Sequence, residues 1–151
     1  MSERIVRYLR EHGIEGELIV LPPDMAKTSQ LAASAVGCEV AQIAKNIVLR
    51  GSQPYLVILS GDRRVDLVKA SKLAGEKLVL MEPDQVLKYT GYPVGGVPPF
   101  GHTRPLKTWV DKSIARFELV YTSGGSPDTL LKITVSELVN HLRAPFVDVS
   151  R

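Results

Sequence analysis

Apolar residues along the chain recur at two spacings, which separate helical segments from extended ones. In residues 3–12 they fall on one face of a helix that Ser2 can cap and Gly13 can end. Residues 45–50 have the apolar centre Ile-Val-Leu between polar ends, and residues 55–60 are a nearly continuous apolar run. A Gly-Ser-Gln turn joins the two segments, which is typical of two paired strands. The pattern therefore predicts short helices mixed with short strands.

The remaining segments extend this pattern to the end of the chain. Helices are predicted at residues 30–36, 66–73, 84–89 and 135–142, with Thr28 or Ser29 capping the first of them and Thr134 the last. Strands are predicted at residues 17–21, 77–81, 108–110, 118–122, 130–133 and 146–149, with turns at residues 40–43 and 123–126. Because helices and strands do not alternate regularly, we expect an α+β fold whose mixed, mainly antiparallel sheet is flanked by short helices. A single domain over residues 1–151 fits this length.

The composition narrows the class of protein. The chain has one cysteine, Cys38, which excludes an internal disulfide and a zinc site built on several thiolates. Its three histidines lack metal-ligand spacing and no cofactor-binding motif occurs, so we expect neither a metal nor a cofactor. No apolar stretch has the length of a signal peptide core or a membrane span, so we expect a cytoplasmic protein without membrane contact.

The charge pattern permits a nucleic-acid partner without requiring one. The net charge is +3 and the pI about 9.1. Basic residues occur singly or in pairs, as at Arg63 and Arg64, and not in a polybasic run. On composition alone, a solvated surface of mixed charge is the favoured interpretation. If RNA is bound, we expect weak affinity with a shallow salt dependence.

Common catalytic motifs are missing, and the most unusual segment is a loop rich in glycine and proline. The sequence contains no Walker motif, no H-E-x-x-H and no G-x-S-x-G. Gly95 and Gly96 allow close approach of a ligand to the backbone, and Pro98 and Pro99 stiffen the chain toward His102. This combination indicates a shaped loop whose remaining amides face a ligand. The alternative is a rigid surface turn.

Two further segments carry candidate chemistry. Lys45 and Asn46 begin an apolar strand, so the ammonium group either points to the mouth of a pocket or is merely solvated. Ser123, Gly124 and Gly125 form a glycine turn, whose amides can bind an anion or a carbonyl group or can simply close a β-turn.

Taken together and in this order, these segments resemble the YbaK/prolyl-tRNA editing family. The similarity covers nearly the whole chain and includes the Thr28-capped helix, residues 43–48, residues 59–66, residues 95–99 and residues 123–125. The family includes freestanding deacylases and the editing domain inserted in bacterial prolyl-tRNA synthetases. Its fold is a mixed, largely antiparallel sheet with flanking helices, in agreement with the fold that the residue pattern predicts.

The resemblance implies a set of residue roles. Lys45 matches the hallmark active-site lysine, and Gly96 would offer its amide to the substrate carbonyl. The substrate-binding residues would be Thr28, Asn46, Gly95, Pro98, Pro99, His102, Ser123, Gly124 and Gly125. Many relatives have Thr or Ser where this chain has Asn46, and residues 126–130 also depart from the family pattern. These departures bear on the substrate amino acid more than on the reaction.

The expected activity is trans-editing, the hydrolysis of the ester in a mischarged tRNA, with tRNA(Pro) carrying Ala or Cys as the first candidate. An ester is already activated, so positioned water and oxyanion stabilisation suffice without a strong nucleophile. The expected partners are the aminoacyl-tRNA 3′ end and a prolyl-tRNA synthetase. Two alternatives remain open: a non-catalytic module that binds tRNA or a synthetase, and a hydrolase of small esters or nucleotides.

Overall fold

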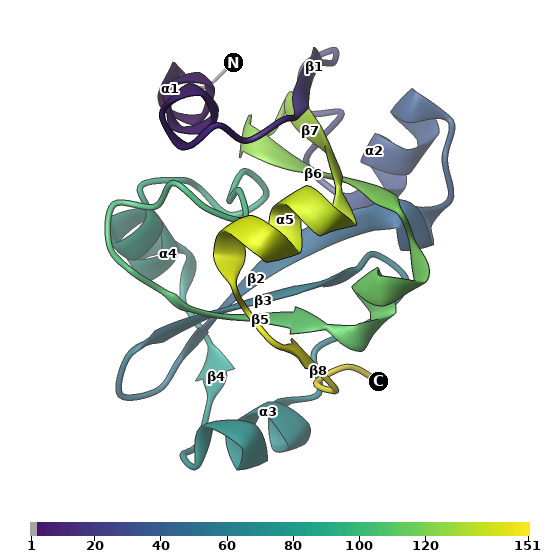
Figure 1. Cartoon of the computed structure of the whole chain (residues 1–151). Coiled ribbons are helices and arrows are strands. Elements are labelled where there is room, and N and C mark those ends of the chain that lie inside the picture. The colour runs from purple at the N-terminus through teal and green to yellow at the C-terminus, as the bar shows by residue number, and fades with distance from the viewer. Residues whose placement is uncertain (1–2) are drawn as a thin grey trace.

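One eight-stranded sheet organises residues 3–151, which the computed structural model describes (Figure 1). The helices are α1 (Glu3–His12), α2 (Ser29–Val36), α3 (Leu67–Ala74), α4 (Pro83–Thr90), α5 (Val135–Leu142) and the short 3-10 turns η1 (Val40–Gln42) and η2 (Lys112–Arg116). The strands are β1 (Glu17–Val20), β2 (Ile43–Arg50), β3 (Pro54–Ser60), β4 (Val79–Leu80), β5 (Lys107–Asp111), β6 (Leu119–Ser126), β7 (Thr129–Thr134) and β8 (Phe146–Val147). No helix in this part of the chain combines the length and apolar character needed to cross a bilayer.

The sheet is mixed, as predicted. Its order is β1-β7-β6-β2-β3-β5-β8, with β4 added beside β2. The pairs β1–β7, β6–β7, β2–β3 and β2–β4 are antiparallel, and the pairs β2–β6, β3–β5 and β5–β8 are parallel. The predicted α+β class with a mainly antiparallel sheet is therefore confirmed.

Polar side chains cap three of the helices, and the caps at Thr28 and Thr134 were predicted. The Thr28 hydroxyl accepts a hydrogen bond from the Leu31 N–H at the start of α2, and the Thr134 hydroxyl accepts one from the Glu137 N–H at the start of α5. Asp66 does the same for α3. The cap predicted at Ser2 lies outside the described residues.

The predicted turn at residues 123–126 is wrong, because this segment continues strand β6. A bulge between Ser123 and Ser126 absorbs the two glycines, and Gly125 has a φ of 97° there. Gly124 lies so close to β7 that a Cβ would come within 2.7 Å of the Thr129 side chain. The chain reverses one step later, at Pro127 and Asp128.

Other differences concern element ends. The strands predicted at residues 77–81 and 146–149 shorten to β4 and β8, and η2 was not predicted. Val149 instead donates its N–H to the buried carboxylate of Asp111, which removes it from regular strand pairing.

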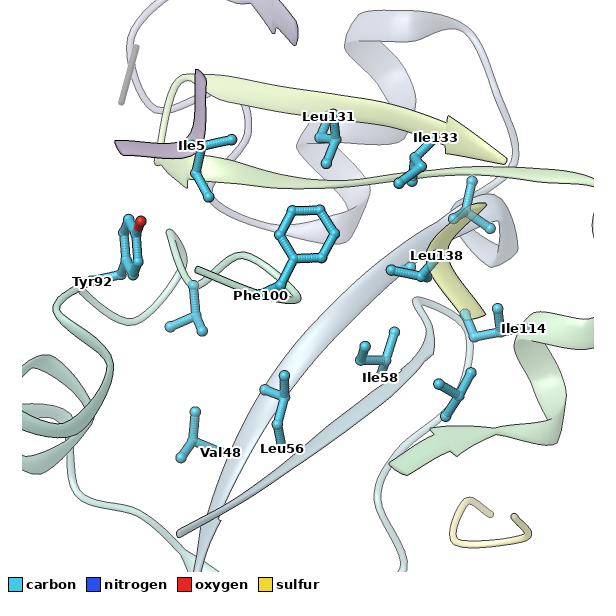
Figure 2. Packing of buried hydrophobic residues seen from close by; sticks show 14 of the residues in the cluster. Ile5, Val48, Leu56, Ile58, Tyr92, Phe100, Ile114, Leu131, Ile133 and Leu138 are labelled. Atoms are coloured by element: carbon cyan, nitrogen blue, oxygen red, sulfur yellow. The ribbon is translucent and has the colours of Figure 1, made fainter. Parts of the chain in front are cut away.

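Alternation along β2 and β3 gives the sheet two apolar faces. Val48, Leu56 and Ile58 face the larger core under α1, α4 and α5, and Leu49 and Val57 face the smaller core with α3. Figure 2 shows the larger core, where the Phe100 side chain lies between residues of β7 and residues of β2 and β3.

The long loop after α4 is anchored at several points. The side chains of Tyr92, Val97 and Phe100 are buried in the larger core. The Tyr92 hydroxyl donates to the Gly101 carbonyl at 3.2 Å, and the Thr103 N–H donates to the Thr90 carbonyl at 3.1 Å. Its glycines and prolines thus belong to a shaped loop, which is held in a fixed position against the sheet.

Candidate active site

Strand β2 has a central stretch with a partner strand on one edge only. β3 pairs with it along its length, whereas β6 pairs with its other edge at Ile43 and Ala44 and β4 at Leu49 and Arg50. Within residues 3–151, residues 45–48 between these pairings have no strand on that edge. A cavity of about 740 Å³ lies at this gap, and all four residues line it.

The backbone of Asn46 faces the gap. The Val48 carbonyl accepts a hydrogen bond from the Met81 N–H on this edge, and the Ile43 carbonyl accepts one from the Gly61 N–H on the opposite edge. Because successive residues of a strand point their N–H and C=O groups to alternate edges, Asn46 points both groups the same way as Val48. This leaves a donor and an acceptor at the cavity for a ligand.

Lys45 supplies a charge without a partner. Its side chain is half-buried and lines the cavity, and it makes no hydrogen bond or ion pair within the described chain. Burial lowers the pKa of its ammonium group, the positive charge of Arg64 lowers it further, and Asp62 partly opposes both. An unpaired, partly desolvated cation binds an anionic or oxygen-rich ligand strongly.

The Asn46 side chain is held in one orientation with one atom left over. Its Nδ2 donates to the Val97 carbonyl at 2.9 Å and to the Thr122 hydroxyl at 2.7 Å. Since a carbonyl only accepts, the position of the nitrogen is fixed, and with it that of Oδ1. Oδ1 is buried and has no partner among the described residues. An unsatisfied buried acceptor costs roughly 1–3 kcal/mol, so this atom indicates a ligand with an N–H or O–H donor.

The first turn of α2 forms another wall of the cavity. Thr28, Ser29 and Gln30 line it, so the positive end of the helix dipole lies beside the Lys45 side. The Thr28 hydroxyl is already engaged as the helix cap, which makes it a positioning group for this turn. Both features favour a negatively charged or electron-rich group of a ligand.

Apolar residues form another part of the wall. They include Met81, Val86, Val94 and Val97 from α4, its approach and the loop, and Leu130 of β7, which packs with α2, while Glu82 adds a carboxylate at the start of α4. The cavity therefore combines polar groups of β2 and α2 with apolar surface.

The two loop glycines have different environments. The Gly96 N–H donates to the Pro93 carbonyl at 2.9 Å, so the amide assigned to substrate by sequence is used within the loop. Gly96 does not line the cavity; a Cβ there would lie 3.3 Å from the Ser126 backbone. Gly95 lines the cavity with a φ of 86°, and its N–H has no partner within residues 3–151. The role predicted for the Gly96 amide therefore fits Gly95 better.

The Ser-Gly-Gly segment contributes only in part. Ser123 lines the cavity, while Gly124 and Gly125 lie in the bulge beside it. The Gly125 N–H donates to the Ser123 hydroxyl at 3.2 Å, so the bulge satisfies part of its own polar groups.

Besides Gly124 and Gly125, three predicted substrate-binding residues lie outside this cavity. Pro98 is buried, and Pro99 and His102 line a second hollow that the same loop borders. The Nε2 of His102 donates to the Pro98 carbonyl at 2.7 Å, because that oxygen can only accept. Burial lowers the pKa of His102, which favours its neutral form. The structure thus brings together Thr28, Lys45, Asn46, Gly95 and Ser123 but not His102.

Gly61 lines the cavity and was not among the predicted site residues. A Cβ there would lie 2.5 Å from the Val40 carbonyl oxygen and 2.8 Å from the Ser29 Cβ, so only glycine lets η1 and α2 approach the end of β3. The sequence signal for it was the Ser-Gly-Asp that directly follows the apolar strand.

Comparison with known proteins agrees with this geometry. Residues 23–140 match the model of the aminoacyl-tRNA editing domain. The chain is 34% identical over 113 residues to the uncharacterised protein YwhH of Bacillus subtilis, covering 74% of this chain and 72% of YwhH. It is 21% identical over 126 residues to EbsC of Enterococcus faecalis, a candidate Cys-tRNA(Pro)/Cys-tRNA(Cys) deacylase, covering 82% of this chain and 77% of EbsC.

Among solved structures, the chain is similar to a candidate trans-editing enzyme for prolyl tRNA synthetase. The TM-score is 0.92 at 35% sequence identity, with 100% of this chain and 99% of the other covered. The family match covers residues of every wall of the cavity, from Thr28 to Leu130. On its sequence and its fold, this chain belongs to the aminoacyl-tRNA editing domain family.

Proposed function

We propose that this protein is a trans-editing deacylase that hydrolyses the ester joining a small amino acid, such as Ala or Cys, to the 3′-terminal ribose of tRNA(Pro). The observation that carries this proposal is the pairing of an uncompensated Lys45 ammonium group with an unsatisfied Asn46 Oδ1 at one cavity. The names of EbsC and of the similar solved structure support the choice of tRNA(Pro).

The two polar groups match the two ends of an aminoacyl ester. Lys45 binds the terminal phosphate or the ribose oxygens and so orients the ester beside β2. Asn46 Oδ1 accepts a hydrogen bond from the α-ammonium group, and the free backbone carbonyl of Asn46 lies on the same edge for a second one. A substrate held at both ends keeps its carbonyl carbon in one place, which is the main requirement for attack by water.

The chemistry follows from positioning and not from a nucleophilic side chain. Water attacks the ester carbonyl, the carbonyl oxygen becomes an oxyanion, and the ribose oxygen leaves as a hydroxyl group. The Gly95 N–H, which has no partner in the described chain, is the proposed donor to that oxyanion. A free hydroxyl of the terminal ribose helps to activate the water, since no triad lines the cavity.

Selectivity comes from limited space and from donor count. The terminal adenosine and the aminoacyl group share one cavity, and Val94 and Val97 form part of its apolar surface. A primary ammonium group offers three N–H donors to the acceptors of Asn46, whereas the ring nitrogen of proline offers two. Small primary amino acids are therefore released and correctly attached proline is spared.

The partners follow from the same reaction. The net charge of +3 is small, so we expect weak binding of tRNA alone and a gain from a prolyl-tRNA synthetase that presents it. Such a protein would act in the cytoplasm with the charged tRNA. Addition of the synthetase to a deacylation assay should then lower the KM for tRNA.

The test is a panel of tRNA(Pro) molecules charged with Ala, Cys, Ser or Pro, each scored for release of the amino acid. We expect release of at least one small amino acid and stable Pro-tRNA(Pro). Efficient cleavage of Pro-tRNA(Pro) would contradict the selectivity. Binding of every charged tRNA without release would instead identify a non-catalytic module.

A further inference from the structure

All three histidines of this chain gather around a second hollow of about 500 Å³. α1, α5 and residues 99–106 border it. His102 and His141 line it, and His12 stacks on Tyr8, which lines it as well. These residues come from three distant parts of the sequence, and the proposed deacylation mechanism uses none of them.

Stacked rings make the inner wall of this hollow. The Tyr8 ring lies between those of His12 and Phe100, with centroid distances of 4.0 and 5.0 Å, and both pairs are stacked. His141 meets Tyr8 and Phe100 edge-on, and its Nε2 shares a 2.6 Å hydrogen bond with the Tyr8 hydroxyl. The cluster is rigid because each ring is held by at least one other ring.

The two lining imidazoles leave hydrogen-bonding atoms free. His102 uses Nε2 to donate to Pro98, and His141 uses Nε2 with Tyr8. Neither Nδ1 has a partner within residues 3–151. For His102, which carries its proton on Nε2, the free Nδ1 is an acceptor. The hollow thus combines ring edges and apolar side chains with atoms that can hydrogen-bond to the edge of a planar ligand.

The rim is cationic. Arg104 lines the hollow, and its guanidinium lies 4.9 Å from the centre of the Tyr89 ring. Arg4 lies 4.5 Å over the ring of Tyr92 on the same side of the loop. Among residues 3–151 no carboxylate lines the hollow, and Glu137 is the acidic residue that acts on His141 from α5. Cations stacked on rings beside an aromatic hollow are the pattern of single-stranded nucleic-acid sites.

The hollow adjoins the Lys45 cavity through one segment of chain. Val94, Gly95 and Val97 line the cavity, and Pro99 begins the wall of the hollow only two residues later. The same loop is therefore a wall of both the cavity and the hollow, as a polymer that occupies both would require.

We propose that this hollow binds a nucleotide of the tRNA acceptor end that precedes the terminal adenosine. Its base packs against the Tyr8 and His141 side chains, and its phosphate pairs with Arg104. This inference rests on the proposed function, because it assumes that the terminal adenosine occupies the Lys45 cavity. It assigns to the histidine cluster a role in holding RNA, outside the chemistry.

The first test uses the histidines as reporters, since the chain has no others. Imidazole NMR signals are followed while uncharged tRNA, adenosine 5′-monophosphate or a non-hydrolysable aminoacyl-adenosine is added. We expect the His102 and His141 signals to move with tRNA and to stay in place with aminoacyl-adenosine. If the signals move with adenosine 5′-monophosphate at a similar concentration, the ligand of the hollow is a free nucleotide and not tRNA. If they do not move with saturating tRNA, the inference is overturned.

The second test is Arg104→Ala, a change at an exposed side chain. We expect KM for charged tRNA to rise about threefold to tenfold and the salt slope to fall by about 0.7, the value for one phosphate on a single strand. The preference for tRNA over aminoacyl-adenosine should fall by the same factor. Arg104→Lys should restore part of it, and the remote Lys77→Ala should change neither.

An unchanged preference in Arg104→Ala would overturn the inference while the wild-type enzyme still deacylates tRNA. Loss of deacylation by the wild-type protein would instead overturn the proposed function. The two failures are therefore distinguishable.

Discussion

Two buried polar groups of this protein, Asp111 and Asn46, differ in whether their hydrogen bonds are complete. The carboxylate of Asp111 accepts from the Ser113 N–H at 3.0 Å, the Val149 N–H at 3.0 Å and the Ser150 hydroxyl at 2.8 Å. Burial opposes its ionisation, and these hydrogen bonds outweigh burial and lower the pKa of Asp111 below its usual value. These hydrogen bonds fasten the end of β5 to η2 and to the C-terminal segment.

Asn46 is equally fixed but has Oδ1 unpaired, and it adjoins Lys45, a cation with no counter-ion in the described chain. In a closed cluster, such as that of Asp111, the polar atoms have partners within the protein, so the cluster contributes to stability and not to ligand binding. In an open cluster, such as that of Asn46 and Lys45, a polar atom lacks a partner, which destabilises the folded chain until a ligand supplies one. The comparison predicts opposite phenotypes for substitutions at the two places.

The largest expected effect is at the closed cluster. Asp111→Ala leaves buried donors unpaired, which should lower the free energy of unfolding by about 3–5 kcal/mol. Denaturant titration measures this. Asp111→Asn keeps one acceptor and should lose less. A folded Asp111→Ala or Asp111→Asn protein should keep the wild-type deacylation rate per folded molecule. A lower rate would contradict the assignment of Asp111 to stability alone.

The next effect is at the open cluster. Asn46→Ala removes the proposed acceptor for the α-ammonium group and should lower kcat/KM about tenfold. Its effect on unfolding should stay within about 1 kcal/mol, because the loss of two hydrogen bonds is offset by removal of an unsatisfied acceptor. Steady-state kinetics and thermal unfolding test both parts. A large loss of stability at constant kcat/KM would show that Asn46 stabilises the fold, as Asp111 does, and does not bind substrate.

A smaller effect tests the loop that completes the open site. Gly95 has a φ of 86°, and a Cβ would lie 3.3 Å from the Lys27 carbonyl oxygen. Gly95→Ala should therefore cost about 1–2 kcal/mol of stability and shift the Gly95 amide, the proposed donor to the oxyanion. We expect deacylation to fall more than with Gly96→Ala, whose amide already bonds Pro93. The reverse order would return the role to Gly96.

The smallest effect is on the pH dependence of stability. Burial lowers the pKa of His102, and burial together with His12 lowers that of His141. The unfolded chain then takes up protons at about pH 6.5, where the folded chain does not, so stability falls as the pH drops below about 6.5. The Asp111 contribution is lost only below about pH 4, as the pH passes through its lowered pKa. His141→Gln should flatten the first step; an unchanged step would show that other groups cause it.

Much of the fold could be predicted from the sequence because its signals are local. The caps at Thr28 and Thr134 and the apolar runs of β2 and β3 each depend on a few neighbouring residues. The turn predicted at the Ser-Gly-Gly segment was wrong because a glycine pair is equally compatible with a turn and with a bulge. Only the pairing of β6 with β7 decides between them.

The candidate site could be predicted in its residues but not in its geometry. Lys45 and Asn46 stood out by their place on an apolar strand, whereas the gap beside them depends on where β6 and β4 stop pairing with β2. The exchange of roles between Gly95 and Gly96 depends on one hydrogen bond to Pro93. The hollow with the three histidines was invisible, since the Tyr8–His141 bond joins residues 133 positions apart.

The most direct test of the account is the single-turnover deacylation rate of Lys45→Ala on Ala-tRNA(Pro) or Cys-tRNA(Pro), measured with its thermal unfolding. We predict a rate lower by about a hundredfold or more. The stability should change by less than about 0.5 kcal/mol, because the side chain is half-buried without a partner. Lys45→Arg should also be impaired, and Lys77→Ala should match the wild type. A folded Lys45→Ala protein with the wild-type rate would contradict the account.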